Sequence, residues 1–552
     1  MTTDMARKKN HFRSVVSLAN SKLSIKAAAL VISSSTLISA LLGIFRDRWL
    51  NSMYYDTYPA GLDAYTAAFT VPDFLFFIIT SGALAVTFVP IFNQRLVNNN
   101  KKSAWELSAS TLNFLALISL VASVVIMIFA DPLVRYVVAP GLNESAMSLA
   151  INMMRVIAIN PFLFSISTVL SSMQQAVGRF FFYAIAPALY NIGIIIGILV
   201  FTNGINIFGI QIFEGGIMGV ALGVVLGAIF QLTTSIIGLI GLGFDYDFKI
   251  HWKNQGFRTV LRLLPGRSVD QGIDYVMSII NTNFASRMGE QSIRAYQQAS
   301  SLHSMPVNLI GVAISTAYFP KLSEEAGRGE HDKFDETLRT ALSSIVWISL
   351  PVAVIAFFLR GYVVNFIKNG GDPKISSVLA SFIVAIFFQS VYHIVARGFY
   401  ARQDARTPLI VSVAAFVVQV IFTVFFSVTG LGPEGLAYAT SISALVEVCI
   451  LLVILNRRSH NTLFKPIFWQ SMLKILLASV IAGIVSYLMT KLLPLRAVDN
   501  SFLNTFPKFF IIVIVTAIAY LVCCLLLGIS EAKPILDRIG KILFRNIKPV
   551  KK

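Results

Sequence analysis

The sequence predicts an all-α polytopic membrane protein with about fourteen transmembrane helices, arranged as two six-helix lobes plus a C-terminal helix pair. Of its 552 residues, 56% are hydrophobic and only 13% are charged, whereas soluble domains carry about 25% charged residues. Apolar runs of about 20 residues recur from residue 26 almost to the C-terminus, and each is long enough to cross the bilayer as a helix. A faint internal repeat indicates two related halves.

The apolar runs place the expected spans in order along the chain. Their approximate ranges are 26–48, 63–91, 105–130, 147–174, 180–202, 216–243, 258–286, 293–320, 335–359, 375–400, 406–429, 432–456, 470–492 and 504–528. We expect these spans to form distinct parts of the molecule. The parts are a basic N-terminal tail (1–25), an N-lobe (26–243), a linker (244–257), a C-lobe (258–456), a terminal helix pair (470–528) and a basic C-terminal tail (529–552).

Lysine and arginine gather in alternate loops, which predicts the orientation in the membrane. Both tails and the loops 92–104 and 244–257 are basic, whereas loops 49–62 and 203–215 contain neither residue. We therefore expect both termini to be cytoplasmic. The net charge of +18 is then explained by cytoplasmic loops and gives no reason to expect a nucleic-acid partner.

Enzyme and cofactor signals are not found in the sequence. The three cysteines, Cys449, Cys523 and Cys524, all lie inside apolar runs, where packing is the ordinary role. No glycine-rich phosphate loop ends in Lys-Ser or Lys-Thr, and no metal-spaced cysteine and histidine set occurs. We expect a transporter without a metal or cofactor.

The internal repeat is carried by paired prolines. Residues 67–94 contain prolines at 72 and 90, and residues 301–325 contain prolines at 306 and 320. A proline inside a helix removes a backbone hydrogen bond and is a common cause of kinks. Pro72 and Pro306 are therefore candidate hinges.

Ionisable side chains inside expected spans are the best candidates for a substrate site, because burying them in a membrane is costly. The candidates are Arg46, Arg48, Asp63, Arg155, Arg267, Asp270, Asp274 and His303. The spacing of residues 267, 270 and 274 places them on one helix face. Two plainer interpretations stand beside these: the arginines at 46 and 48 snorkel while paired with Asp47 or Asp63, and the histidine is a satisfied hydrogen-bonding partner rather than a proton carrier.

Several stretches resemble the MurJ (MviN) family of lipid II flippases, in the multidrug/oligosaccharidyl-lipid/polysaccharide exporter superfamily. The motifs are LLGIFRD (41–47), DAYTAAFTVPD (63–73), GALAVTFVPIF (82–92), IINTNFAS (279–286) and ARGFYARQDARTP (396–408). The resemblance covers nearly the whole chain.

This resemblance implies two six-helix lobes around a cationic cavity, and a groove for a lipid tail at the last two helices. The implied activity is to flip lipid II, a polyprenyl-pyrophosphate-linked peptidoglycan precursor, across a bacterial inner membrane by alternating access. The implied partners are the lipid-linked glycan, membrane lipids and proteins of envelope synthesis or division. Arg46 would contact the headgroup, with Asp63 as its electrostatic partner or gate.

The chain departs from the family pattern at several charged positions. Four positions that are basic in the family read Ala40, Thr70, Phe76 and Ser301, and an acidic one reads Ser81. Three alternatives follow from these losses: an exporter of another lipid-linked glycan, an exporter of small molecules, or an inactive scaffold of an envelope-synthesis complex.

Overall fold

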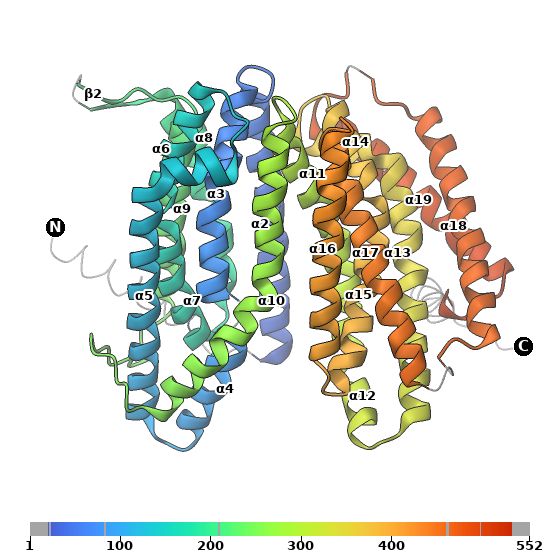
Figure 1. Cartoon of the computed structure of the whole chain (residues 1–552), viewed down its shortest axis with the longest axis horizontal. Coiled ribbons are helices and arrows are strands. Elements are labelled where there is room, and N and C mark those ends of the chain that lie inside the picture. Colours follow the sequence, from blue (N-terminus) through green and yellow to red (C-terminus); the bar gives the residue numbers. More distant parts are fainter. Residues whose placement is uncertain are drawn as a thin grey trace, which may run out of the picture. The chain divides into compact units, whose positions relative to one another are not determined.

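The computed structural model describes residues 20, 24–81, 84–207, 210–459, 463–496 and 498–532, without the side chains of 25–26, 29, 80–81, 84–86, 207, 210 and 265–271. The chain divides between Arg294 and Ala295 into two compact units, and Figure 1 shows each unit as a bundle of long helices. Twelve helices in the described ranges are long and apolar enough to cross a membrane. The predicted class of all-α polytopic membrane protein is thus confirmed, while the count of about fourteen spans stays a prediction.

The first unit consists of helices and one small hairpin. In chain order its elements are α2 (Ile25–Tyr54), α3 (Pro59–Phe76), η1 (Phe77–Ser81), α4 (Leu84–Val97), α5 (Lys101–Pro132), η2 (Leu133–Val138), α6 (Glu144–Ile157), α7 (Asn160–Ala176), α8 (Phe181–Leu199), η3 (Phe201–Asn203), β1 (Ile205–Ile207), β2 (Ile210–Phe213), α9 (Met218–Ile237) and α10 (Gln255–Ser286). The antiparallel strands β1 and β2 lie in the loop that we expected at 203–215.

The second unit is helical throughout its described part. Its elements are α11 (Ser292–Pro306), which begins within the last three residues of the first unit, η4 (Val307–Val312), α12 (Ala313–Gly327), α13 (His331–Ile367), α14 (Pro373–Ser381), α15 (Ile383–Ala401), α16 (Arg406–Val428), α17 (Pro433–Arg458), α18 (Pro466–Leu492), α19 (Phe502–Leu526) and η5 (Ser530–Ala532).

Each expected span coincides with one helix or with two or three consecutive helical elements. The fourth span is α6 and α7 together, because Pro161 begins a new helix near residue 160. The expected seventh and eighth spans are helical as α10 and α11 to α12, but they are not among the twelve apolar helices. α10 contacts α3, α4 and η1, so the division of the chain falls later than the linker that we expected at 244–257.

Three π-helices each follow a proline. η1 begins five residues after Pro72, while η2 and η4 directly follow Pro132 and Pro306. A proline cannot donate the hydrogen bond that the α-helical pattern requires, and a wider turn is one way to accommodate the gap. Both candidate hinges therefore lie beside irregular turns, and their bending stays a prediction.

Glycines bring α8 and α9 into close contact. A Cβ at Gly193 would lie 2.3 Å from the Cα of Gly227, and one at Gly197 would lie 2.6 Å from the Cα of Gly223. Small residues of this kind let helix backbones approach in membrane proteins. α8 also packs against α2. It therefore lies beside the helix that carries Arg46 and Asp47.

Candidate functional site

A polar cluster lies inside the first unit, around one carboxylate of α2. We call it the Asp47 cluster, and its members are Arg46, Asp47 and Asn51 of α2, Asp63 of α3, Asn191 of α8 and Arg294 at the start of α11. Ionisable groups inside a membrane protein need compensating partners because water is not there to solvate them. The cluster supplies those partners from four helices.

Two guanidinium groups share the carboxylate of Asp47. Arg46 Nη2 lies 3.1 Å from Asp47 Oδ1 and 3.2 Å from Oδ2, and Arg294 Nη2 donates to Oδ1 at 3.3 Å. Arg294 also donates from Nε and Nη2 to Asn51 Oδ1, at 3.1 and 2.9 Å. The negative charge of Asp47 is thus divided between an arginine next to it in sequence and one that is 247 residues away.

Asp63 caps the N-terminus of α11. Its Oδ1 accepts the backbone N–H of Arg294, the third residue of that helix, at 2.8 Å. A carboxylate at this position satisfies an N–H that the helix leaves without a partner, and it complements the positive end of the helix dipole. The side chain of Gln291 adds a second tie by donating to the carbonyl of Tyr55 at 3.0 Å. These contacts hold the backbone at Arg294, and so fix the point from which its side chain extends.

Asn191 completes the cluster from α8. Its Oδ1 accepts from Arg46 Nη1 at 3.0 Å, and its Nδ2 donates to the carbonyl of Ser39 at 3.2 Å. The amide therefore orients the guanidinium from the side opposite Asp47. α8 packs against α2, which brings this amide within reach of Arg46.

Burial differs sharply between the two arginines. The Arg294 side chain is only 4% exposed, whereas the Arg46 side chain is 25% exposed and that of Asp47 is 18% exposed. The formal charges of the two arginines and of Asp47 and Asp63 cancel. Arg46 is therefore the more exposed of the two guanidinium groups, while Arg294 shares Asp47 from the buried side.

The structure brings two of the sequence-predicted residues into this cluster. Arg46 pairs with Asp47, as the plainer interpretation held, and Asp63 accepts the backbone N–H of Arg294. Arg48 lies half-buried two residues beyond Arg46 on α2. Whether any of them contacts a substrate stays a prediction.

The remaining candidates of the first unit lie elsewhere on its helices. Arg155 is exposed in the last turn of α6, and Asp274 is exposed on α10. Arg267 and Asp270 fall on α10 too, but their side chains lie outside the described part. Their shared helix face therefore stays an expectation from spacing.

His303 belongs to the second unit and makes two contacts. Its Nδ1 lies 2.7 Å from the carbonyl of Ser300, and its Nε2 lies 2.9 Å from Gln389 Oε1. The ring also stacks on Phe382 with centroids 4.4 Å apart. These contacts fit a hydrogen-bonding partner that ties α11 to α15. Pro306, three residues on, ends α11.

Sequence reasoning missed Arg294. It is the second residue of the span that we expected at 293–320, so it met our own criterion of an ionisable residue inside a span. A position at the end of a span is where an arginine usually snorkels into the headgroup region. Only the fold shows that this end of α11 is buried against α2 and α3.

A family model and the named relatives of this chain point to the same family. A family model described as lipid II flippase MurJ matches residues 59–524. A protein named probable lipid II flippase MurJ from Thermotoga maritima is 25% identical over 519 residues, covering 92% of this chain and 98% of the relative. A relative of the same name from Bdellovibrio bacteriovorus is 26% identical over 469 residues, covering 83% and 86%. One from Burkholderia cenocepacia, named lipid II flippase MurJ, is 24% identical over 443 residues, covering 78% and 84%.

Solved structures agree on the fold. A lipid II flippase MurJ in an inward closed conformation superposes with a TM-score of 0.71 at 23% identity, covering 94% of this chain and 99% of that one. An inward-facing MATE family multidrug transporter superposes with a TM-score of 0.61 at 18% identity, covering 78% and 98%. Because the family model matches far more than half of its length, this chain belongs to the lipid II flippase MurJ family.

Proposed function

We propose that this protein flips lipid II, moving its pyrophosphate-linked headgroup from the inner to the outer leaflet of a bacterial cell membrane. Support comes from the family and from relatives that are named lipid II flippases over most of both chains. The single observation that carries the proposal is the Asp47 cluster, in which a partly exposed arginine shares a carboxylate with a buried one.

Recognition proceeds by exchange at Arg46. A guanidinium binds phosphate oxygens in the same two-pronged geometry in which it binds a carboxylate. A pyrophosphate oxygen replaces Asp47 on Arg46, while Arg294 Nη2 remains on Asp47. Asp47 thus keeps one guanidinium partner while Arg46 turns to the phosphate, which limits the cost of the exchange.

Arg294 also adds a positive charge in a chain that lacks several basic residues of the family pattern. It lies seven residues before Ser301, where the family pattern places an arginine, and the two positions are two helical turns apart. The four neutral positions therefore do not leave Arg46 as the lone cation of this region. Arg294 acts here as a positioning residue, because it contacts Asp47 rather than the substrate.

The proposed transport begins on the cytoplasmic side of the membrane. Both termini and the loops 92–104 and 244–257 face the cytoplasm, as the positive-inside rule indicates. The headgroup enters from that side, and the irregular helices at Pro72 and Pro306 bend during alternating access. Transport of this kind needs no bond to be made or broken in the substrate.

The test is complementation of a bacterial strain depleted of its own lipid II flippase, scored by the amount of lipid II exposed on the outer leaflet. We expect the wild-type chain to restore flipping. Arg46→Gln should lower the rate at least about tenfold, since a charge-assisted hydrogen bond contributes about 1.5–3 kcal/mol. The flipping rate of Arg294→Gln should lie between those of the wild type and Arg46→Gln.

The matched control is Arg287→Gln, which removes an exposed arginine of the first unit. It should flip lipid II at the wild-type rate. If the wild-type chain is expressed in the membrane and fails to restore flipping, lipid II is not the substrate. If Arg46→Gln and Arg287→Gln behave alike, the Asp47 cluster is not the headgroup site.

A further inference from the structure

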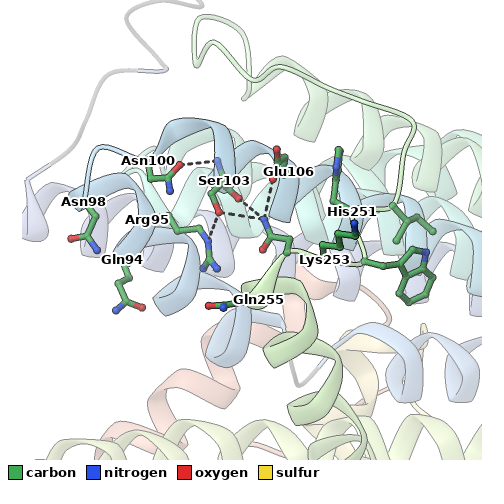
Figure 2. Close-up of a pocket in the computed structure, with 12 residues that line it drawn as sticks. Gln94, Arg95, Asn98, Asn100, Ser103, Glu106, His251, Lys253 and Gln255 are labelled. Carbon is green, nitrogen blue, oxygen red and sulfur yellow. Dashed lines mark hydrogen bonds between the residues drawn. The ribbon is translucent and has the colours of Figure 1, made fainter.

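A surface pocket of about 930 Å³ lies in the first unit and shares no residue with the Asp47 cluster (Figure 2). It is formed by the end of α4, the turn that follows, the start of α5 and the segment before α10. Its lining residues are Gln94, Arg95, Asn98, Asn100, Ser103, Glu106, Ile250, His251, Trp252, Lys253, Asn254 and Gln255. All but Ile250 and Trp252 are polar or charged, so the pocket is built for a polar ligand.

Asn254 holds the pocket together. Its Nδ2 donates to the carbonyl of Ser103 at 3.2 Å and to Glu106 Oε2 at 3.4 Å. Its Oδ1 accepts the N–H groups of Gly256 and Phe257, which caps α10. Glu106, the carboxylate in the pocket lining, therefore accepts a hydrogen bond from the amide of Asn254. The same amide connects the start of α5 to the start of α10.

Arg95 presents its guanidinium at the pocket wall. Nε donates to Ser103 Oγ at 2.9 Å and Nη1 to the carbonyl of Ile91 at 3.2 Å, and Figure 2 shows the contact with Ser103. A Cβ at Gly256 would lie 2.4 Å from this guanidinium, so the glycine makes room for it. Nη2 has no hydrogen-bond partner in the described ranges and is available to a ligand.

The surroundings are strongly basic. Lys253 is exposed, and its ammonium has no ion-pair partner among the residues that the structure describes. Segments 94–106 and 245–262 together contain seven lysines and arginines and three acids. The cations are Arg95, Lys101, Lys102, Lys249, Lys253, Arg258 and Arg262, and the acids are Glu106, Asp245 and Asp247, the last of which lies 3.2 Å from His251. This imbalance attracts anions.

Exposed aromatic side chains beside the pocket indicate where the anion comes from. Trp252 is 54% exposed, Phe248 86% and Tyr246 40%. Tryptophan and tyrosine concentrate at the level of lipid headgroups, and α5, which begins at the pocket, is one of the helices able to span a membrane. A soluble anion would gain nothing from these rings, whereas a lipid would.

We propose that this pocket binds the phosphate headgroup of an anionic phospholipid at the cytoplasmic membrane surface. Arg95 Nη2 and Lys253 Nζ donate to the phosphate oxygens, and the aromatic side chains lie among the neighbouring lipids. Bound lipid fixes the starts of α5 and α10 relative to the bilayer. This inference does not depend on the transported substrate, because it concerns a different site.

The experiment is a titration of the purified full-length protein in nonionic detergent, followed by microscale thermophoresis. Three probes are compared: dioctanoyl phosphatidylglycerol, dioctanoyl phosphatidylcholine and inorganic phosphate. We expect the first to bind tightest. Lys253→Gln should weaken its binding about tenfold, as expected for one charged donor to phosphate.

Lys249→Gln is the matched control, because it removes the same charge from an exposed position in the same loop that does not line the pocket. Gly256→Ala is a second variant, which displaces the guanidinium without changing the charge and should also weaken binding. Equal losses for the two lysine variants would mean diffuse surface attraction and would overturn the proposal. Equal affinity for phosphatidylglycerol and phosphatidylcholine, or for inorganic phosphate, would overturn the anionic lipid as the ligand.

Discussion

The two units contain the same backbone feature in different chemical surroundings. In the first unit α3, η1 and α4 carry Pro72 and Pro90, and in the second α11, η4 and α12 carry Pro306 and Pro320. In both, a proline is followed by a wide helical turn. The repeat that the sequence suggests is thus matched by local structure in each unit.

The polar side chains that connect helices differ between the units. The first unit has an ion-pair network whose Arg294 side chain is only 4% exposed. The corresponding part of the second unit has a histidine that contacts a carbonyl and an amide oxygen and stacks on Phe382. The two units therefore share an irregular turn after a proline, whereas the Asp47 cluster belongs to the first.

The largest effect is expected from Asp47→Asn. The change leaves two guanidinium groups without their shared carboxylate, and breaking a buried pair costs on the order of 3 kcal/mol. The melting temperature of the purified protein should fall clearly. Asp131→Asn, at an exposed carboxylate 3.6 Å from Arg135, should leave it nearly unchanged. Equal melting temperatures for the two variants would show that the Asp47 cluster stabilises the first unit no more than an exposed ion pair does.

Gly311→Ala tests the turn of the second unit. A Cβ there would lie 2.8 Å from the Cα of Ser390 on α15, so the backbone must move, at about 1–3 kcal/mol. The matched change in the first unit is Gly272→Ala, where a Cβ would lie 3.6 Å from the Ile78 side chain of η1, an ordinary contact. Unfolding in increasing denaturant should separate the two variants, and a larger loss at Gly272 would contradict the packing described.

A smaller effect is expected from His303→Phe. The substitution keeps a ring against Phe382 and removes both polar contacts, which should lower the free energy of unfolding by about 1–2 kcal/mol. The flipping rate per folded molecule should stay within about twofold of wild type, unlike that of Arg46→Gln. A complete loss of flipping would show that the second unit also carries substrate chemistry.

The smallest effect is a pH dependence at the loop between α15 and α16. Burial alone would raise the pKa of Asp404, but the hydroxyl and N–H of Thr407 and the guanidinium of Arg458 together lower it below its usual range. A lowered pKa contributes stability that is present above the unfolded value, near 4, and is lost as pH falls through the folded value. Asp404→Asn should therefore reduce stability slightly at pH 7 and not at the lowest pH at which the protein stays folded. If the stability of Asp404→Asn depends on pH as that of the wild type does, ionised Asp404 does not contribute to stability.

Much of the fold was predictable because the membrane dictates length and polarity. Residues 41–47 and 63–73 lead to a helix pair with Arg46, Asp63 and Pro72 in the expected places. The hairpin of β1 and β2 was not predicted, since strands of three and four residues give only a weak pattern. The break of the fourth span near residue 160 lies at Pro161, which the sequence offers as a plausible bending point by the same rule as Pro72 and Pro306.

The site was predictable only in part. Arg46 and Asp63 were selected as ionisable residues inside spans, yet the sequence paired them with each other or with a neighbour. In the structure both are connected through Arg294, which lies 231 residues from Asp63 and 247 from Asp47. Spacing rules act within one helix, so they have no means to find a partner at that separation.

By itself the sequence determined that the chain is a membrane protein, where its helices run and which prolines interrupt them, because the bilayer imposes those requirements on every segment locally. Only the tertiary structure decided which arginine is buried, which carboxylate it shares and which helix end Asp63 caps. Those choices depend on how distant helices pack, as where Gly193 and Gly227 let α8 and α9 approach closely. Compensation of charge inside the membrane is therefore a property of the assembled unit and not of any one span.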